Sequence, residues 1–179
     1  MPEKIEIRIP KITTERLVLR AFTHKDALTL FDILQVEGVL RYFPDPIPPS
    51  RERVERFIER QLAHWEEHGF GWWAVVPQGG EELIGWNGLQ FIPETDEIEL
   101  GYLLSKPFWG QGLAVEGGQA ALEFGFETLG LERIIGLVHP DNIASQRVLE
   151  KLGMTFTNQA SYFGMQVYRY ALERADHVW

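Results

Sequence analysis

The stretch Pro107-Phe108-Trp109-Gly110-Gln111-Gly112-Leu113-Ala114 follows a strand-like segment and opens the longest helix-like segment of the chain. Glycines within it let the backbone turn tightly and approach a ligand closely. The first turn of the following helix offers unpaired N–H groups and the positive end of the helix dipole. The stretch therefore fits a phosphate or pyrophosphate site. A tight strand-to-helix turn without a ligand is the alternative that this stretch alone leaves open.

Two other glycine-rich phosphate sites do not match this spacing. In a dinucleotide-binding turn, a third glycine would stand where this chain has Val115. In a Walker loop, Lys-Ser or Lys-Thr would follow Gly112, and here Leu113 and Ala114 follow it. The stretch is therefore typical of neither a Rossmann fold nor a P-loop nucleotidase.

Outward from this stretch, the apolar residues alternate between strand-like and helix-like periods. Strands are expected at 16–22, 72–76, 83–91, 97–104 and 133–139, with a closing hairpin at 154–158 and 166–172; helices are expected at 23–35, 50–68, 113–129 and 142–152. Ser50 is a good N-cap, and Gly69 ends the same helix. The order is neither a regular βαβ repeat nor all-β. It predicts an α+β fold around a largely antiparallel sheet, in one domain over 1–179.

Composition narrows the function. The 179 residues include no Cys, which excludes disulfides, thiolate catalysis and Cys-based metal sites. The histidines do not have the paired spacing of a metal site, so no metal is expected. The net charge of −9 argues against nucleic-acid binding and weakly suits a cationic acceptor. The sequence contains no run of eighteen apolar residues, so no membrane span is predicted. Met1–Glu6 lacks a basic region followed by an apolar run, so a cytoplasmic protein is expected.

Three ordered stretches resemble the GNAT acetyltransferases. They are Glu99-Leu100-Gly101-Tyr102-Leu103-Leu104, the stretch from Pro107 to Glu116, and Asn142-Ile143-Ala144-Ser145-Gln146-Arg147-Val148-Leu149-Glu150-Lys151-Leu152-Gly153. The chain is most similar to the branch with the ribosomal-protein N-terminal acetyltransferases, which Thr14–Arg20 also resembles. The resemblance covers nearly the whole chain, and three motifs in order are more specific than any one of them.

The resemblance implies an N-acetyltransferase that moves an acetyl group from acetyl-CoA to a primary amine, without a metal. It implies a GNAT-like central sheet with flanking helices, in which two strands splay to admit the pantetheine arm. Backbone amides from Gly110 to Ala114 would hold the CoA pyrophosphate. The expected cofactor-binding residues are Tyr102, Leu103, Leu104, Trp109, Gly110, Gln111, Gly112, Leu113, Ala114, Asn142 and Ser145.

Two side chains are the candidates for catalysis. Glu99 shares a strand face with Gly101 and Leu103 and could deprotonate the amine through water; its alternative is a solvated carboxylate. Ser145 could protonate the leaving thiolate; its alternative is a small residue in a helical turn. Asn142 could likewise bind pantetheine or cap the helix. The chain departs from many family members by having Leu149 where they have a tyrosine.

The acceptor pocket of the family is framed by the first two helices and the strands that face them. In this chain that points to Tyr42, Trp72, Trp86 and Asn87. A protein N-terminus is one expected acceptor, and a small amine such as a polyamine or aminoglycoside is another. A non-catalytic acyl-CoA-binding module is the alternative outside enzymes. A homodimer is a further expectation.

Overall fold

The computed structural model describes residues 8–178. Its sheet has the strand order β1-β2-β3-β4-β5-β6-β8-β7. Neighbouring strands are antiparallel except β5 and β6, which are parallel. The strands are β1 Ile12–Thr13, β2 Leu17–Arg20, β3 Trp72–Pro77, β4 Gly85–Ile92, β5 Glu97–Leu104, β6 Arg133–Val138, β7 Thr155–Tyr162 and β8 Met165–Glu173; the α-helices are α1 Asp26–Gln35, α2 Arg51–His68, α3 Leu113–Glu123 and α4 Ile143–Lys151.

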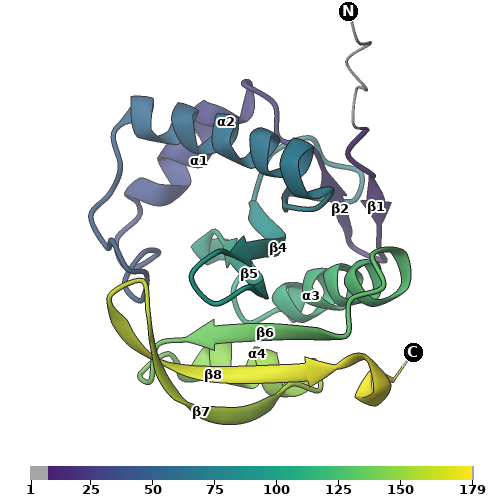
Figure 1. The fold of residues 1–179 in the computed structure, drawn as a ribbon. Coiled ribbons are helices and arrows are strands. Elements are labelled where there is room, and N and C mark those ends of the chain that lie inside the picture. The colour runs from purple at the N-terminus through teal and green to yellow at the C-terminus, as the bar shows by residue number, and fades with distance from the viewer. Residues whose placement is uncertain (1–7, 179) are drawn as a thin grey trace, which may run out of the picture.

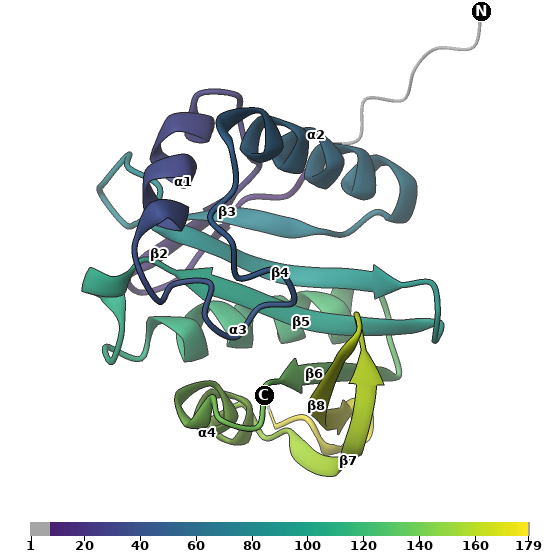
Figure 2. The ribbon, with the colours of Figure 1, turned by 90° about the vertical axis from the view of Figure 1, so that its left-hand side faces the viewer.

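Helices cover both faces of the sheet (Figures 1 and 2). On one face, α1 and α2 pack with Ala74, Trp86 and Leu103. On the other face, α3 and α4 pack with Leu100 and with residues of β6 and β8. The β7–β8 hairpin continues the sheet beyond β6 (Figure 2). The expected α+β fold with a largely antiparallel sheet is confirmed.

The helix 51–68 has the ends that its sequence predicts. The Ser50 hydroxyl accepts a hydrogen bond from the Arg53 backbone N–H at 3.3 Å. Gly69 ends the helix in the left-handed region at φ 74°, and its N–H donates to the Trp65 carbonyl. Trp65, which continues the apolar stripe, is buried in the core. Local capping chemistry and periodicity were therefore sufficient for this element.

Three elements differ from the sequence-based expectation. The two-residue β1 was not expected because so short a strand shows no alternation. The expected helix 113–129 is α-helical only to Glu123 and continues as a π-helix over Phe124–Thr128. The closing hairpin is longer than expected, since β7 and β8 extend to a tight turn at Phe163 and Gly164.

The helix α3 has two glycines in its interior because its neighbours lie close. A Cβ on Gly117 would lie 3.0 Å from Asn87 Nδ2, and one on Gly118 would lie 2.7 Å from Leu152 Cδ1. Glycine in a helix interior costs about 1 kcal/mol relative to alanine. The close packing of α3 against Asn87 and Leu152 therefore explains why these glycines are tolerated.

The parallel junction between β5 and β6 is short. Its register has a single pair, Glu99 with Ile135, whereas β5 pairs with β4 along its whole length from Glu97 to Leu104. Within the described residues 8–178, the ladder does not continue beyond Glu99 toward the carboxyl ends of the two strands. This interrupted ladder is the splay that the GNAT resemblance implies.

Two further expectations concern the chain as a whole. No helix in the described part of the chain is long and apolar enough to cross a membrane. The expectation drawn from Met1–Glu6 falls outside the described residues.

Candidate active site

The glycine-rich loop joins β5 to α3 and leaves its backbone open. Gly110 and Gly112 have φ values of 72° and 79°, in the left-handed region that favours glycine. A Cβ on Gly110 would meet no atom within 4 Å, so its neighbours leave open space at that point. Gly112 is the N-cap residue of α3 and provides no side-chain cap for the first-turn N–H groups. Uncapped N–H groups at a helix N-terminus, together with the helix dipole, are features that suit an anion.

The larger side chains of this loop bind the loop itself. Trp109 Nε1 donates to the Leu104 carbonyl at 2.6 Å, and Gln111 Nε2 donates to the Pro107 carbonyl at 2.8 Å. Trp109 is nevertheless about half exposed, at 48%. Trp109 and Gln111 therefore shape the loop through their hydrogen bonds to its own backbone carbonyls.

An ion pair that the sequence did not reveal holds the loop to the sheet. Arg16 Nε lies 2.7 Å from Glu116 Oε2, and Arg16 Nη1 donates to the Gln111 carbonyl at 2.9 Å. Glu116 also accepts from the Thr14 hydroxyl at 2.6 Å and from the Arg16 backbone N–H at 2.7 Å. The same guanidinium places Nη2 only 3.6 Å from the position of a Cβ on Gly112, so a cation stands beside the loop.

Glu99 occupies the single ladder pair between β5 and β6. Burial raises the pKa of its carboxyl to about 8, although a backbone hydrogen bond from Leu137 acts in the opposite direction. Gln90 Nε2 is 3.4 Å from Glu99 Oε2. Glu99 is therefore half-buried, whereas the alternative interpretation was a solvated surface carboxylate. Its pKa lies near the value that is useful for a base at neutral pH.

Tyr102 and Ser145 meet across the same junction. The Tyr102 hydroxyl lies 2.6 Å from Ser145 Oγ and 3.3 Å from the Ser145 carbonyl oxygen. The Asn142 side-chain oxygen accepts the Ser145 backbone N–H at 3.2 Å, so Asn142 is the N-cap of α4. The alternative interpretation of Asn142 as the helix cap is therefore confirmed, and its contact with pantetheine stays a prediction.

Leu149 lies one helical turn beyond Ser145, where many family members have a tyrosine. It is buried, and a Cβ on Gly136 of β6 would lie 2.8 Å from one of its methyl groups. The side chain therefore packs between α4 and the sheet as part of the core. In this chain the nearest phenol hydroxyl to Ser145 comes from β5 instead.

Aromatic side chains line the face of the sheet that Glu99 shares with Gly101. A Cβ on Gly101 would lie 2.9 Å from Trp72 Nε1, so the indole of Trp72 covers this glycine. Trp72 stacks on Trp86 with ring centroids 5.6 Å apart and planes at 18°. Both indole Nε1 atoms are buried and, in the described part of the chain, have no hydrogen-bond partner.

Tyr42 and Asn87 lie apart from this tryptophan pair. Tyr42, in the loop between α1 and α2, contacts the ring of His139 just after β6, with centroids 5.2 Å apart. Asn87 lies on the opposite face of the sheet from Trp86 and packs against Gly117 of α3. The structure therefore groups Trp72 with Trp86, places Tyr42 at the end of the junction, and separates Asn87 from all three.

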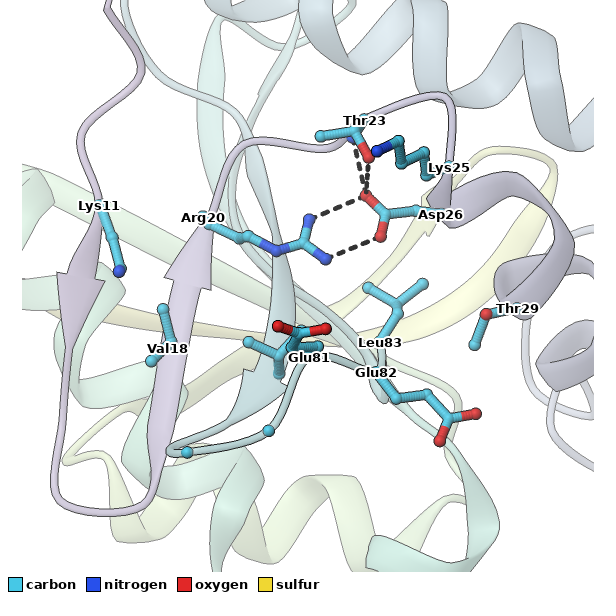
Figure 3. A pocket seen from close by; sticks show the side chains of 13 residues that line it. Lys11, Val18, Arg20, Thr23, Lys25, Asp26, Thr29, Glu81, Glu82 and Leu83 are labelled. Atoms are coloured by element: carbon cyan, nitrogen blue, oxygen red, sulfur yellow. Dashed lines mark hydrogen bonds and ion pairs between the residues drawn. The ribbon is translucent and has the colours of Figure 1, made fainter.

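A pocket at another corner of the molecule holds no predicted site residue (Figure 3). It lies between β2, the start of α1 and the turn between β3 and β4. Arg20 forms two hydrogen bonds of 2.8 Å with Asp26, which also accepts from the Thr23 backbone N–H at 2.7 Å. The Arg20–Asp26 pair in this pocket therefore fixes the first turn of α1. Glu81 and Glu82 line the opposite side of the pocket.

No group of three or more His, Asp or Glu side chains that could hold a metal ion occurs among residues 8–178.

Comparisons with known proteins agree with this arrangement. Residues 16–155 match the acetyltransferase (GNAT) domain family. The chain is 32% identical over 145 residues to the uncharacterized N-acetyltransferase YoaA of Bacillus subtilis (strain 168), covering 80% of this chain and 82% of that protein. An acetyltransferase structure from Agrobacterium tumefaciens str. C58 superposes with a TM-score of 0.83 at 28% identity, covering 97% of this chain and 99% of the other.

A third similarity shows the fold alone. The structure titled RimL, ribosomal L7/L12 alpha-N-protein acetyltransferase in complex with coenzyme A, has a TM-score of 0.75 at 23% identity. It covers 92% of this chain and 97% of its own. Together with the family match over most of the sequence, the findings show that the chain belongs to the GNAT family of N-acetyltransferases.

Proposed function

We propose that this enzyme transfers an acetyl group from acetyl-CoA to the α-amine of a protein N-terminus. The observation that carries the proposal is the position of Glu99. It is a half-buried carboxylate with a pKa of about 8, placed where the β5–β6 ladder ends and on the face lined by Trp72. A base at the end of an interrupted ladder lies where an acyl arm and an amine from opposite sides would meet.

The residues present fit the donor. The open backbone of Gly110 and Gly112 and the uncapped first turn of α3 suit a pyrophosphate. The unpaired length of β5 after Glu99 supplies backbone groups for the amides of the pantetheine arm, which would add like a short strand. Bound in this way, acetyl-CoA supplies an activated acetyl group as its thioester.

The chain's own residues then have three tasks. Glu99 takes a proton from the amine, directly or through water, so that the nitrogen can attack the thioester carbonyl. The carbon–nitrogen bond forms, the carbon–sulfur bond breaks, and the electron pair goes to sulfur. Ser145 gives its hydroxyl proton to that sulfur. Positioning of the two substrates lowers the barrier further, by up to about 7–11 kcal/mol in ideal cases.

The chemistry of the acceptor face favours a peptide over a polycation. Its walls are the stacked indoles of Trp72 and Trp86, which carry no negative charge. The neighbouring carboxylate on the same strand face, Glu97, is already paired with Arg169 and Tyr162. A polyamine or aminoglycoside would need several free carboxylates. The protein in the RimL structure is titled an alpha-N-protein acetyltransferase, which supports a protein N-terminus as the acceptor.

The test is release of CoA thiol from acetyl-CoA in the presence of a panel of amines. Peptides with free N-termini should be acetylated, and the same peptides with a blocked N-terminus are the matched control. Preference for spermidine or an aminoglycoside over every peptide would favour the small-amine alternative. Tight binding of acetyl-CoA with no release for any amine would favour the non-catalytic module. Cytoplasmic location and a homodimer stay predictions.

A further inference from the structure

A hydrogen bond between two hydroxyl groups joins β5 to α4. Tyr102 Oη lies 2.6 Å from Ser145 Oγ, and the two residues stand on opposite sides of the β5–β6 junction. Serine and tyrosine each carry one hydroxyl hydrogen and can also accept. Only one of the two hydrogens can lie between the oxygens, so the other is available for a third atom.

The position of Ser145 is fixed by its own helix end. Its backbone N–H donates to the Asn142 side chain at 3.2 Å, in the first turn of α4. Tyr102 is fixed as well, because its ring packs against the apolar core formed with α3 and α4. The hydroxyl contact therefore connects two held groups, and neither has to move for the other to reach it.

Two acceptors lie within reach of the Tyr102 hydroxyl, Ser145 Oγ at 2.6 Å and the Ser145 carbonyl oxygen at 3.3 Å, and the shorter contact favours donation to Ser145 Oγ. Burial raises the pKa of the Tyr102 phenol, and the charge of Glu99 raises it further, while the hydrogen bond with Ser145 acts in the opposite direction. The phenol therefore keeps its hydrogen. When that hydrogen points to Ser145 Oγ, the serine hydrogen is free to point elsewhere.

We propose that Tyr102 is the positioning residue for Ser145: its hydroxyl donates to Ser145 Oγ and directs the serine hydrogen to the leaving sulfur. The inference rests on the proposed function and assigns to β5 the hydroxyl that Leu149 cannot supply. As the carbon–sulfur bond breaks, the serine proton moves to sulfur and the Tyr102 hydrogen bond stabilises the serine oxygen. Glu99 releases the amine's proton to water and the serine regains one from water, so amine and thioester give amide and thiol.

The first test is a double-mutant cycle on turnover. Tyr102→Phe keeps the ring in the core and removes only the hydroxyl. It should lower kcat more than tenfold, about 1.4 kcal/mol of barrier, with the Kd for acetyl-CoA within a few-fold of wild type. Ser145→Ala should lower kcat at least as much, and the double variant should be no slower than Ser145→Ala. The control is Tyr168→Phe, which removes a phenol hydroxyl from β8 and should keep the wild-type kcat. Wild-type turnover in Tyr102→Phe, or additive losses in the double variant, would overturn the assignment.

The second test reports on the sulfur itself. The chain has no Cys, so the thiol of bound CoA is the only thiol that iodoacetamide can alkylate in the complex. Hydrogen bonds to a thiolate lower the pKa of its thiol. The alkylation rate of bound CoA should therefore rise at lower pH in wild type than in Tyr102→Phe or Ser145→Ala, and the two variants should have the same profile.

The outcomes separate this inference from the proposed function. Identical pH profiles for wild type and Tyr102→Phe would show that the phenol does not act on the sulfur, even if the enzyme acetylates peptides as proposed. If the wild-type protein binds acetyl-CoA but releases no CoA thiol with any amine, the proposed function is wrong. A lower thiol pKa in wild type than in Tyr102→Phe would then still support the contact between the hydroxyl pair and the sulfur.

Discussion

The guanidinium of Arg16 binds the carboxylate of Glu116, 100 residues away, at 2.7 Å. The same guanidinium donates to the Gln111 carbonyl in the glycine-rich loop. The pair therefore connects the entry to β2, the loop and the first turn of α3. Burial raises the pKa of the Glu116 carboxyl, but hydrogen bonds from the Thr14 hydroxyl and from Arg16 outweigh it and hold this pKa below its usual value.

Glu116→Gln should loosen this connection. The amide nitrogen of glutamine would face the Arg16 donor in place of an oxygen, and the free energy of unfolding should fall by about 1–3 kcal/mol. The Kd for acetyl-CoA should rise because the loop is less fixed. Thermal unfolding and calorimetric titration measure the two effects. Glu123→Gln, an exposed acid on the same helix, is the control, and equal effects from both substitutions would contradict the role of Glu116.

Gly110→Ala should weaken acetyl-CoA binding through the shape of the loop. Alanine at φ 72° is strained by about 1–2 kcal/mol, and its methyl group would enter the open space in front of the loop. Gly130→Ala is a close match, with φ 68° and likewise no atom within 4 Å of the Cβ position, in the turn after the π-helix. Both variants should lose similar stability, and only Gly110→Ala should raise the Kd in titration calorimetry. An equal Kd in both would rule out the loop as the pyrophosphate site.

Glu99→Gln should lower turnover by about 10²–10⁴-fold, since it removes the base and keeps the shape. Acetyl-CoA affinity should hardly change. In wild type, kcat should rise with pH through about 8 as Glu99 loses its proton, and the variant should lack this limb. Steady-state kinetics from pH 6 to 9 tests this, with the exposed Glu94→Gln as control. A variant with wild-type kcat would show that Glu99 is not the base.

The same carboxyl should also affect stability. Its folded-state pKa is raised, so the stability present below the ordinary glutamate pKa is lost as pH rises toward 8. The free energy of unfolding of Glu99→Gln minus that of wild type should therefore be largest at high pH. Thermal unfolding of both proteins at pH 5 and pH 9 measures the difference, which should be larger at pH 9. A difference that does not depend on pH would contradict the raised pKa.

His64 should make the fold sensitive to acid. Its Nε2 accepts the Phe91 backbone N–H at 3.1 Å, so Nδ1 carries the hydrogen and donates to the Phe70 carbonyl at 2.8 Å. Burial is the main reason that the pKa of His64 is lowered. Stability present above the ordinary histidine pKa is therefore lost as pH falls through and below it. The Tm of wild type should fall between pH 8 and 5 more steeply than that of His64→Gln, and the exposed His24→Gln should follow wild type.

Elements with strong local signals could be predicted from the sequence. Ser50 and Gly69 mark the ends of α2 by their own capping chemistry, and β5 has its expected bounds of Glu97 and Leu104 because its alternation is uninterrupted. The bounds of α3 could not be predicted in the same way. The helix changes to a π-helix at Phe124, where a Cβ on Gly125 would lie 2.6 Å from Ile134 of β6, a contact with a distant strand that no local pattern encodes.

The site shows the same division. The glycine-rich turn before α3 could be predicted because glycines before a helix are a local motif, and its role in binding CoA stays a prediction. The hydrogen bond between Tyr102 and Ser145 spans 43 positions, and its existence depends on how α4 sits on the sheet. Asn87 adjoins Trp86 in sequence and was grouped with it, yet consecutive strand residues point to opposite faces. That alternation was available in the sequence and would have separated them.

The single ladder pair between β5 and β6 has a consequence for how the protein opens. Five strands, β1 to β5, form one hydrogen-bonded unit, and β6, β8 and β7 form another. The backbone links the two units by little more than Glu99 and Ile135 in the sheet, although α3 packs across both. A donor arm that pairs with β5 would therefore act as an additional strand between two foldons. Acetyl-CoA should then slow amide hydrogen exchange in both halves at once, so that the substrate contributes to the cooperativity of the fold.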